Sequence, residues 1–275
     1  MADERPAPAG IDTSTPNVAR MWDYQLGGKD NFAADRQAAE AVNEALREAG
    51  APSGRDAARE NRAFIGRAVR FLAQEAGIRQ FLDLGSGLPS MGNVHEIAQQ
   101  VAPDARVAYV DYDPVVLVHA RALLADTDRV TVVQGDLREP EGILDHPDVR
   151  KLLDFDQPVA VLLIAALHLL KDDEDPVGIV ARIRDALAPG SYLALTHATR
   201  EEHREGAAVL ATQFQRLRVT TPIIPRTRTE IARFFDGFEL AEPGLVFPSQ
   251  WRPDPPAAST DQGSAWMLAG VGRKP

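Results

Sequence analysis

Apolar stretches and helical patterns alternate along most of the chain. Five short stretches rich in Val, Leu and Ile predict strands, at residues 80–84, 106–111, 129–134, 158–165 and 190–197. Between and after them, apolar residues recur at helical spacing, at residues 91–101, 114–125, 175–187 and 201–216. Apolar strands separated by helices are typical of a parallel sheet covered on both faces. The pattern therefore predicts an α/β fold.

The two ends of the chain have a different pattern. Residues 1–16 are rich in Pro, Ala, Asp and Thr and predict a flexible tail. Residues 17–60 include a run dense in Ala, Glu and Arg at 35–49, which predicts a helix. We expect residues 17–60 to form a helical extension that serves as a lid. Residues 61–275 are then the main domain, with its last strand at 264–271.

The composition limits the chemistry that the chain can perform. Its 275 residues include no Cys, which excludes thiol catalysis, disulfides and thiolate metal sites. Forty acidic against 30 basic residues give a net charge of −10, which disfavours a nucleic-acid partner. The sequence shows no signal peptide and no apolar run that could span a membrane, so a cytoplasmic protein is expected. No close metal-site spacing of His, Asp and Glu is present, and no metal is predicted.

Glycines join the first predicted strand to the helix that follows it. The segment Asp83-Leu84-Gly85-Ser86-Gly87 ends the strand and enters the turn. Glycine turns at this place let a ligand approach the backbone and the helix N-terminus. A tight turn without a ligand would use the same glycines, so the segment alone does not establish a site.

Acidic residues follow the next two strands. Asp111, directly before Tyr112, ends the second strand, where a carboxylate can bind both ribose hydroxyls of a nucleoside. Asp136 and Leu137 follow the third strand, where an acid can accept a hydrogen bond from an adenine amino group. Each acid taken singly is more often a loop carboxylate in solvent. Signals at the ends of three consecutive strands, where α/β sheets bind ligands, indicate a nucleoside cofactor.

Two nucleoside cofactors are compatible with a glycine turn of this kind. The spacing Gly85-x-Gly87-x-x-Ser90 approaches the dinucleotide fingerprint G-x-G-x-x-G, but Ser90 stands in place of the last glycine. Asp83, just before the glycines, would repel a pyrophosphate and attract an ammonium group. The residues therefore favour S-adenosylmethionine, and an NAD-dependent Rossmann enzyme is the less favoured alternative.

These segments resemble motifs I, II and III of class I S-adenosylmethionine-dependent methyltransferases. From about Pro16 to Gly272, the chain is similar to the actinobacterial S-adenosyl methyltransferase family, once catalogued as a domain of unknown function. Besides the three motifs, the resemblance rests on segments at 24–32, 60–62, 87–96, 109–123, 167–168 and 188–197. It implies a Rossmann-like, seven-stranded, mostly parallel sheet with helices on both faces, an antiparallel last strand and an N-terminal helical extension.

The resemblance also implies which residues hold the cofactor, S-adenosyl-L-methionine. The glycine turn would lie beside the methionine end of the cofactor, Asp111 would bind the ribose, and Asp136 with Leu137 would contact the adenine. The full set of residues expected at the cofactor is Asp83, Gly85, Ser86, Gly87, Asp111, Tyr112, Asp136, Leu137 and Ala165.

The methyl acceptor is harder to place, because transfer from a sulfonium needs positioning more than a base. The composition of residues 21–32 predicts a shaped loop better than a regular element. Residues 22–32 either close the pocket or form a packing loop anchored by Trp22 and Phe32. His168 follows the fourth strand and His197 ends the fifth. Each is either a base near neutral pH or a structural histidine. The candidates are Tyr24, His168 and His197 for catalysis, and Tyr24, Gly28, Lys29, Asp30, Asn31, Arg62, Asn93 and His95 for the lid or the substrate.

The leading hypothesis is a methyltransferase that acts on a small-molecule acceptor, with no nucleic-acid or membrane partner. A second hypothesis is a regulatory protein that binds the cofactor without transferring its methyl group, because no catalytic base is evident in the sequence. The acceptor, the methylated atom and the oligomeric state are left open.

Overall fold

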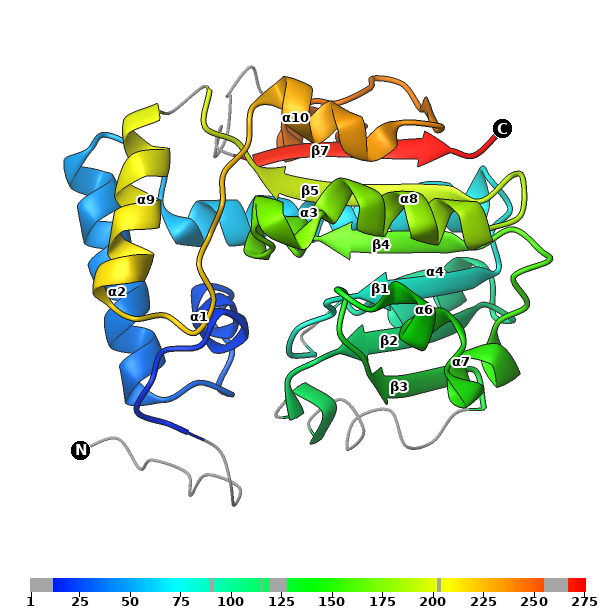
Figure 1. Ribbon diagram of the computed structural model, residues 1–275, viewed down its shortest axis with the longest axis horizontal. Helices are drawn as coiled ribbons and strands as arrows, with labels where there is room; N and C mark the ends of the chain where they lie inside the picture. The colour runs from blue at the N-terminus through cyan, green and yellow to red at the C-terminus, as the bar shows by residue number, and fades with distance from the viewer. Residues whose placement is uncertain (1–11, 90–91, 115, 119–127, 202–203, 255–266) are drawn as a thin grey trace.

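The computed structural model describes residues 12–89, 92–114, 116–118, 128–201, 204–254 and 267–275. They form a seven-stranded sheet with helices on both faces and a further group of helices beyond one end of the strands (Figure 1). Ser90 and residues 119–125 of a predicted helix lie outside the described residues. No helix in the described ranges is long and apolar enough to cross a membrane.

The sheet has the predicted Rossmann-like arrangement. Its strand order is β3-β2-β1-β4-β5-β7-β6, in which β1 to β5 are mutually parallel and β7 is antiparallel to both its neighbours. The parallel strands lie within two residues of their predicted bounds. The strands are β1 (Gln80–Leu84), β2 (Arg106–Asp111), β3 (Val130–Gln134), β4 (Ala160–Ile164), β5 (Tyr192–Ala198), β6 (Glu239–Leu240) and β7 (Met267–Arg273).

The sheet separates two hydrophobic cores, because its parallel strands are apolar on both faces. In β1, Leu82 and Leu84 belong to one core and Phe81 to the other. The first core is covered by α6 (Pro140–Leu144), α7 (Pro147–Leu152), α8 (Pro176–Ala186), α10 (Arg228–Ala232) and η3 (Arg233–Phe235). The second is covered by α3 (Gly54–Gln74), α4 (Val94–Val101) and the segment around η4 (Pro248–Gln250).

Three helices pack together beyond the carboxyl ends of the parallel strands (Figure 1). They are α1 (Val18–Gln25), α2 (Ala33–Glu48) and α9 (Arg204–Arg216), and together we call them the cap. Their apolar faces meet in a third core that includes Met21, Val42, Leu46, Leu210 and Phe214. A buried salt bridge of 2.8 Å between Arg20 and Asp35 joins α1 to α2. The cap therefore has its own packed interior.

The first cap helix corrects the sequence prediction of a shaped loop at 21–32. Residues 21–25 belong to α1, which begins after Asn17. The Asn17 side chain accepts hydrogen bonds from the backbone N–H groups of Ala19 (2.9 Å) and Arg20 (3.3 Å), as an N-cap residue does. Gly27, with φ of 80°, lies just beyond the last turn. Only one face of α1 contacts the cap core, so many of its residues are polar and the sequence pattern does not indicate a helix.

Residues 12–16 are attached to the cap, although the sequence predicts a flexible tail there. The Arg20 guanidinium donates to the carbonyl oxygens of Asp12 (3.1 Å) and Thr15 (2.8 Å). The backbone N–H of Thr220 donates to the carbonyl of Pro16 (3.0 Å). The boundary expected at residue 60 falls inside α3, which packs on the sheet and also touches α1 and α2.

Candidate functional site

A cavity of about 180 Å³ lies between the carboxyl ends of the strands and the cap. Its walls come from α1 and α3, from the segments that follow β1 to β4, and from Thr221 between α9 and α10. All nine residues expected at the cofactor line it: Asp83, Gly85, Ser86, Gly87, Asp111, Tyr112, Asp136, Leu137 and Ala165. The strand-end signals of the sequence thus converge on one space.

The glycine turn after β1 is held by the end of β2. Gly85 and Gly87 have φ of 72° and 66°, a conformation that residues with a side chain rarely adopt. The N–H of Gly85 donates to the carbonyl of Val110 (2.8 Å). The Asp111 carboxylate accepts the N–H of Gly87 and the N–H of Asp113, one on each oxygen, both at 2.9 Å. Each oxygen keeps a further lone pair, so Asp111 can also bind two hydroxyl groups.

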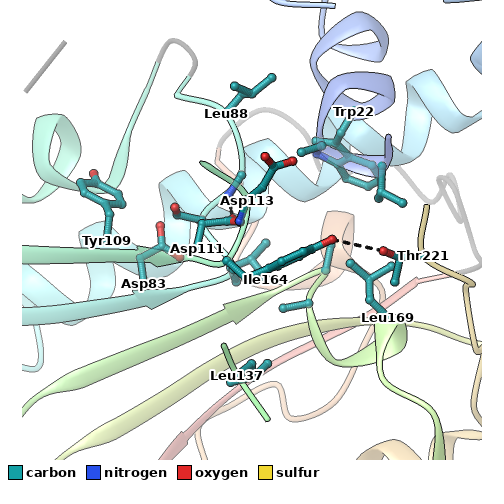
Figure 2. A pocket seen from close by; sticks show the side chains of 18 of the residues that line it. Trp22, Asp83, Leu88, Tyr109, Asp111, Asp113, Leu137, Ile164, Leu169 and Thr221 are labelled. Carbon is teal, nitrogen blue, oxygen red and sulfur yellow. Dashed lines mark hydrogen bonds between the residues drawn. The ribbon is translucent and has the colours of Figure 1, made fainter. Parts of the chain in front are cut away.

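Asp83, Asp111 and Asp136 form what we call the acidic end of the cavity. Figure 2 shows Asp83 and Asp111 close together, beside Tyr109. Burial raises the pKa of Asp83 to about 7; the nearby Arg62 opposes this effect and Asp111 adds to it. Burial also raises the pKa of Asp111, although its backbone hydrogen bonds act in the opposite direction. Desolvated carboxyl groups of this kind favour a cationic ligand, which stabilises their charged form.

Asp136 continues the acidic end towards solvent and is held by a residue that the sequence does not predict. Arg138 donates to Asp136 from its backbone N–H (2.9 Å) and from its guanidinium (2.8 Å). The same guanidinium donates to Glu174 at 2.6 Å. Arg138 also lines the cavity. No motif could indicate it, because its position depends on Glu174, 36 residues further along the chain.

The opposite side of the cavity is apolar, and we call it the apolar end. Its walls are Val18, Trp22, Leu26, Ile65, Leu169 and Leu170. In Figure 2, Trp22 and Leu169 lie on the side away from Asp83. The Tyr112 hydroxyl and Thr221 Oγ1 are 3.4 Å apart at this side, in a long hydrogen bond. A smaller cavity of about 40 Å³, lined also by residues of the cap, shares Val18, Trp22, His168 and Leu169 with the larger one.

Two buried polar side chains, Asn61 and His168, also line this space. Asn61 Oδ1 accepts a hydrogen bond of 2.6 Å from Thr196 Oγ1, which in turn accepts the N–H of Ala165 at 2.9 Å. Ala165 has φ of 54°, a strained backbone for a residue with a side chain. Asn61 belongs to the segment 60–62 that carries the family resemblance, but it is not among the predicted site residues. Its polar side chain four residues before Ile65, in line with the apolar stripe of α3, is the signal that could have found it.

The two histidine candidates are placed differently. The N–H of Ala198 donates to His168 Nδ1 (3.2 Å), so the proton of the neutral ring is on Nε2. Burial, reinforced by the charge of Arg226, lowers the pKa of His168 to about 3. His197 does not line the cavity: its Nδ1 donates to the carbonyl of Ala198 (2.8 Å) and its Nε2 accepts from Arg226 (2.9 Å). The structure favours a structural role for His197 and a neutral donor, not a base, at His168.

Most of the predicted lid stretch lies away from the cavity. The Tyr24 hydroxyl donates to Glu40 on α2 (2.7 Å). Asp30 through its N–H and Asn31 through its side chain donate to Asp23 Oδ2, at 2.9 and 2.8 Å. Tyr24, Gly28, Lys29, Asp30 and Asn31 are absent from the cavity lining, whereas Trp22, Asp23 and Leu26 belong to it. Only the helical part of the stretch reaches the site, because the turn folds back onto α1.

Of the remaining candidates, Arg62 and Asn93 line the cavity and His95 does not. Arg62 donates to the carbonyl of Gly92 at 3.3 Å. The N–H of His95 donates to the Tyr109 hydroxyl (2.9 Å), and its Nδ1 lies 2.8 Å from the same oxygen. His95 therefore positions Tyr109, which lines the cavity in its place.

Comparison with known proteins gives one family. The model of the family described as S-adenosyl methyltransferase matches residues 4–275. A candidate methyltransferase from Thermobifida fusca YX is 47% identical, with a TM-score of 0.88 over 97% of this chain and 98% of that chain. A DUF574 family protein from Streptomyces avermitilis MA-4680 is 42% identical, with a TM-score of 0.89 over 96% and 99%. Mitomycin 7-O-methyltransferase MmcR is 18% identical (TM-score 0.52, 97% and 74%) and shares the fold. No curated protein matches the chain.

Proposed function

The chain belongs to the S-adenosyl methyltransferase family, and we propose that it methylates a small molecule held at the apolar end of the cavity. It is an S-adenosylmethionine-dependent methyltransferase, so the NAD-dependent alternative has no support. A small acceptor is favoured because the cavity lies between the strand ends and the cap. The net charge of −10 disfavours a nucleic-acid acceptor.

The residues of the acidic end fit S-adenosylmethionine. When bound, this cofactor supplies an electrophilic methyl group on a positively charged sulfur. We assign Asp111 to the ribose hydroxyls, Asp136 with Leu137 to the adenine, and Asp83 to the side of the cationic methionine end. Gly85 leaves the turn free of a side chain, and a Cβ built there would lie 3.0 Å from that of Ala166. The backbone can therefore approach a ligand closely.

The observation that carries the proposal is the continuity of one cavity from the acidic end to the apolar end. Methyl transfer is an in-line displacement, so most of its rate can come from holding two reactants in line and excluding water. The apolar walls supply the dry surface, and the acidic end supplies fixed charge. No base is required when the nucleophile enters without a proton.

Calorimetric titration with S-adenosylmethionine and S-adenosylhomocysteine tests the cofactor assignment. We expect Asp111→Ala to weaken binding by about tenfold or more, since it removes a ligand of the ribose and the anchor of Gly87. Asp185→Ala, on the exposed side of α8, is the matched control and should bind as the wild type does. Absence of binding to both compounds would contradict the assignment.

Transfer of a labelled methyl group tests the acceptor class. The protein, labelled S-adenosylmethionine and a cell lysate are incubated together, and the products are separated into small-molecule, protein and RNA fractions. We expect label in the small-molecule fraction, and much less of it there with Asp111→Ala at a subsaturating cofactor concentration. Label confined to protein or RNA would show that the acceptor class is wrong.

A further inference from the structure

We propose that Asn61 and His168 form a pair of N–H donors that binds an ionised oxygen of the methyl acceptor. The acceptor is then an apolar molecule that carries a carboxylate or a phenolate, and this oxygen receives the methyl group. The inference rests on the proposed function, because it takes the apolar end to be the acceptor site. It deepens that function by naming the chemical group that is methylated.

His168 is held as a donor by its surroundings. Its Nδ1 is occupied by the N–H of Ala198, so Nε2 carries the hydrogen. The backbone carbonyl of His168 accepts the N–H of Ile224 at 2.7 Å, which holds the residue to the segment that carries Thr221. Burial and the charge of Arg226 keep the ring neutral, with its pKa lowered to about 3. At neutral pH the ring can donate from Nε2 and does not take up a proton.

The side-chain amide of Asn61 is also oriented so that its nitrogen is available as a donor. Its Oδ1 accepts from Thr196 Oγ1 at 2.6 Å, because that hydroxyl already accepts the N–H of Ala165 and has its own hydrogen to give. The amide NH₂ must therefore point the other way. Within the described residues, neither this nitrogen nor His168 Nε2 has a hydrogen-bond partner.

Both nitrogens face open space. The residues are 2% and 3% exposed, so nearly all of each side chain is enclosed. The fully enclosed polar side-chain atoms without a partner, among those described, are Ser249 Oγ and Trp251 Nε1. The two nitrogens are not among them, and the space that both residues line is the cavity. N–H donors that open into a cavity without a protein partner are available to a ligand oxygen.

The two N–H donors favour an anionic oxygen over a cation. Arg226 lies near His168, with its guanidinium on His197 Nε2 (2.9 Å), on the carbonyl oxygens of Leu167 (3.1 Å) and Leu170 (2.9 Å), and on the carboxylate of Asp172 (2.7 Å). Neutral N–H donors in a dry site bind an oxyanion more strongly than in water. A cation at the same place would meet two N–H donors and no acceptor from the pair.

The other acids of the lining that lie outside the acidic end are already engaged. Asp23 Oδ2 accepts from Asp30 and from the Asn31 side chain (2.8 Å), and Asp113 Oδ2 accepts from Asn17 at 3.0 Å. Their Oδ2 atoms are therefore directed onto protein donors. Arg62, which lies near Asp83 and donates to the carbonyl of Gly92, would be a separate partner of suitable charge for the methionine carboxylate.

This arrangement removes the need for a base. The ionised oxygen of the acceptor forms the new bond to the methyl carbon while the carbon–sulfur bond breaks, and the electron pair of that bond stays on sulfur. The products are a methyl ester or ether and S-adenosylhomocysteine, and no proton moves in the step. The N–H pair serves to hold the oxygen in line and to keep water away from it.

The test measures binding of probes to protein saturated with S-adenosylhomocysteine. Benzoate and 4-nitrophenolate are the two oxyanion probes, and benzylammonium is the cation of similar size. We expect at least one oxyanion to bind about tenfold or more tightly than the cation, by calorimetry or ligand-detected NMR. Preference for benzoate indicates a carboxylate acceptor, and preference for 4-nitrophenolate a phenolate.

Matched variants separate the donors from their structural bonds. In His168→Asn the side-chain oxygen can still accept the N–H of Ala198, but the distal donor is lost; His168→Gln retains a donor near the Nε2 position. Asn61→Asp keeps the acceptor for Thr196 and replaces the NH₂ by a charged oxygen. We expect Asn61→Asp to abolish the preference for oxyanions over the cation. His168→Asn should weaken oxyanion binding about fivefold, and His168→Gln should keep the oxyanion affinity within about twofold of the wild type.

The affinity for S-adenosylhomocysteine distinguishes the possible failures. We expect all three variants to change it by less than about threefold. Loss of this affinity with the oxyanion preference intact would show that the pair faces the cofactor, and would overturn the inference. Equal or tighter binding of benzylammonium, or no binding of either oxyanion, would also overturn it while leaving the cofactor assignment standing. Failure of the wild type to bind S-adenosylhomocysteine would overturn the proposed function itself.

Discussion

The acidic end and the apolar end of the cavity are built in different ways. At the acidic end, each carboxylate lies at or just beyond the end of its own strand. Backbone N–H groups nearby in the fold hold two of them, Gly87 and Asp113 on Asp111, and Arg138 on Asp136. The apolar end is assembled from α1, α3, η1 (Leu167–Leu169) and Thr221, which are distant in sequence. A strand end can present charge by itself, whereas a dry wall needs several elements packed together.

Arg226 is the main connection within the apolar end. Its buried guanidinium bonds the carbonyl oxygens of Leu167 and Leu170, the ring of His197 and the carboxylate of Asp172. It thereby joins the segment after β4 to the end of β5. No comparable side chain joins the acidic carboxylates, within the described residues, because backbone N–H groups already hold Asp111. The two ends should therefore respond separately to substitution.

The largest expected effect is that of Arg226→Met on stability. Removing a buried charged donor leaves its acceptors unsatisfied, and we expect the free energy of unfolding to fall by about 3–5 kcal/mol. Arg47→Met, at an exposed salt bridge of α2, should cost less than about 0.5 kcal/mol. Urea unfolding measures both. If Arg226→Met folds but loses affinity for S-adenosylhomocysteine more than for oxyanion probes, the two ends are not independent.

Asp83→Asn should stabilise the ligand-free protein above pH 7. Because burial raises the pKa of Asp83 from 3.8 to about 7, the folded state holds a proton that the unfolded state has lost between these values. Wild-type stability therefore falls as pH rises through this window, and the penalty is complete above pH 7. We expect the variant to gain up to about 4 kcal/mol at pH 8 and little at pH 4. Equal gains at both pH values, in urea unfolding, would refute this account.

The affinity of the wild type for S-adenosylmethionine should rise with pH. Ionised Asp83 favours the cationic ligand, and a group with a pKa of about 7 goes from mostly protonated at pH 6 to mostly ionised at pH 8. We expect affinity to increase by about tenfold across this range. Calorimetry in buffers of different ionisation enthalpy should show proton release near pH 6.5. A flat profile that matches Asp83→Asn would exclude Asp83 from the cofactor site.

The smallest expected effect is that of Gly87→Ala. Its Cβ would meet no atom within 4 Å, so only the positive φ opposes it, at about 1 kcal/mol. Gly142→Ala, at an ordinary helical position of α6 with no atom near the added Cβ, is the control and should be neutral or stabilising. Thermal unfolding measures both variants. We expect Gly87→Ala to weaken cofactor binding and to leave the affinity for oxyanion probes unchanged. Loss of probe binding alone would contradict the assignment of Gly87 to the cofactor.

Much of the fold and of the acidic end can be predicted from the sequence. The positions of Asp83, Asp111 and Asp136 follow from the rule that parallel strands end at the same edge of a sheet. The prediction of a loop at 21–25 is wrong because helix formation there depends on the Asn17 cap and on burial in the cap core. The roles of Asn61 and Arg138 are not predicted, because they depend on hydrogen bonds to Thr196 and Glu174, which lie far along the chain.

By itself, the sequence determines the positions of the parallel strands, the glycine turn and the acids at the strand ends, because each depends on residues close together in the chain. Only the tertiary structure decides what faces the methyl acceptor. His168 becomes a donor through the N–H of Ala198 and the charge of Arg226, and Asn61 through Thr196. Tautomer, pKa and exposure are set by neighbours that meet only after the cap and the sheet have packed, and no local pattern encodes them.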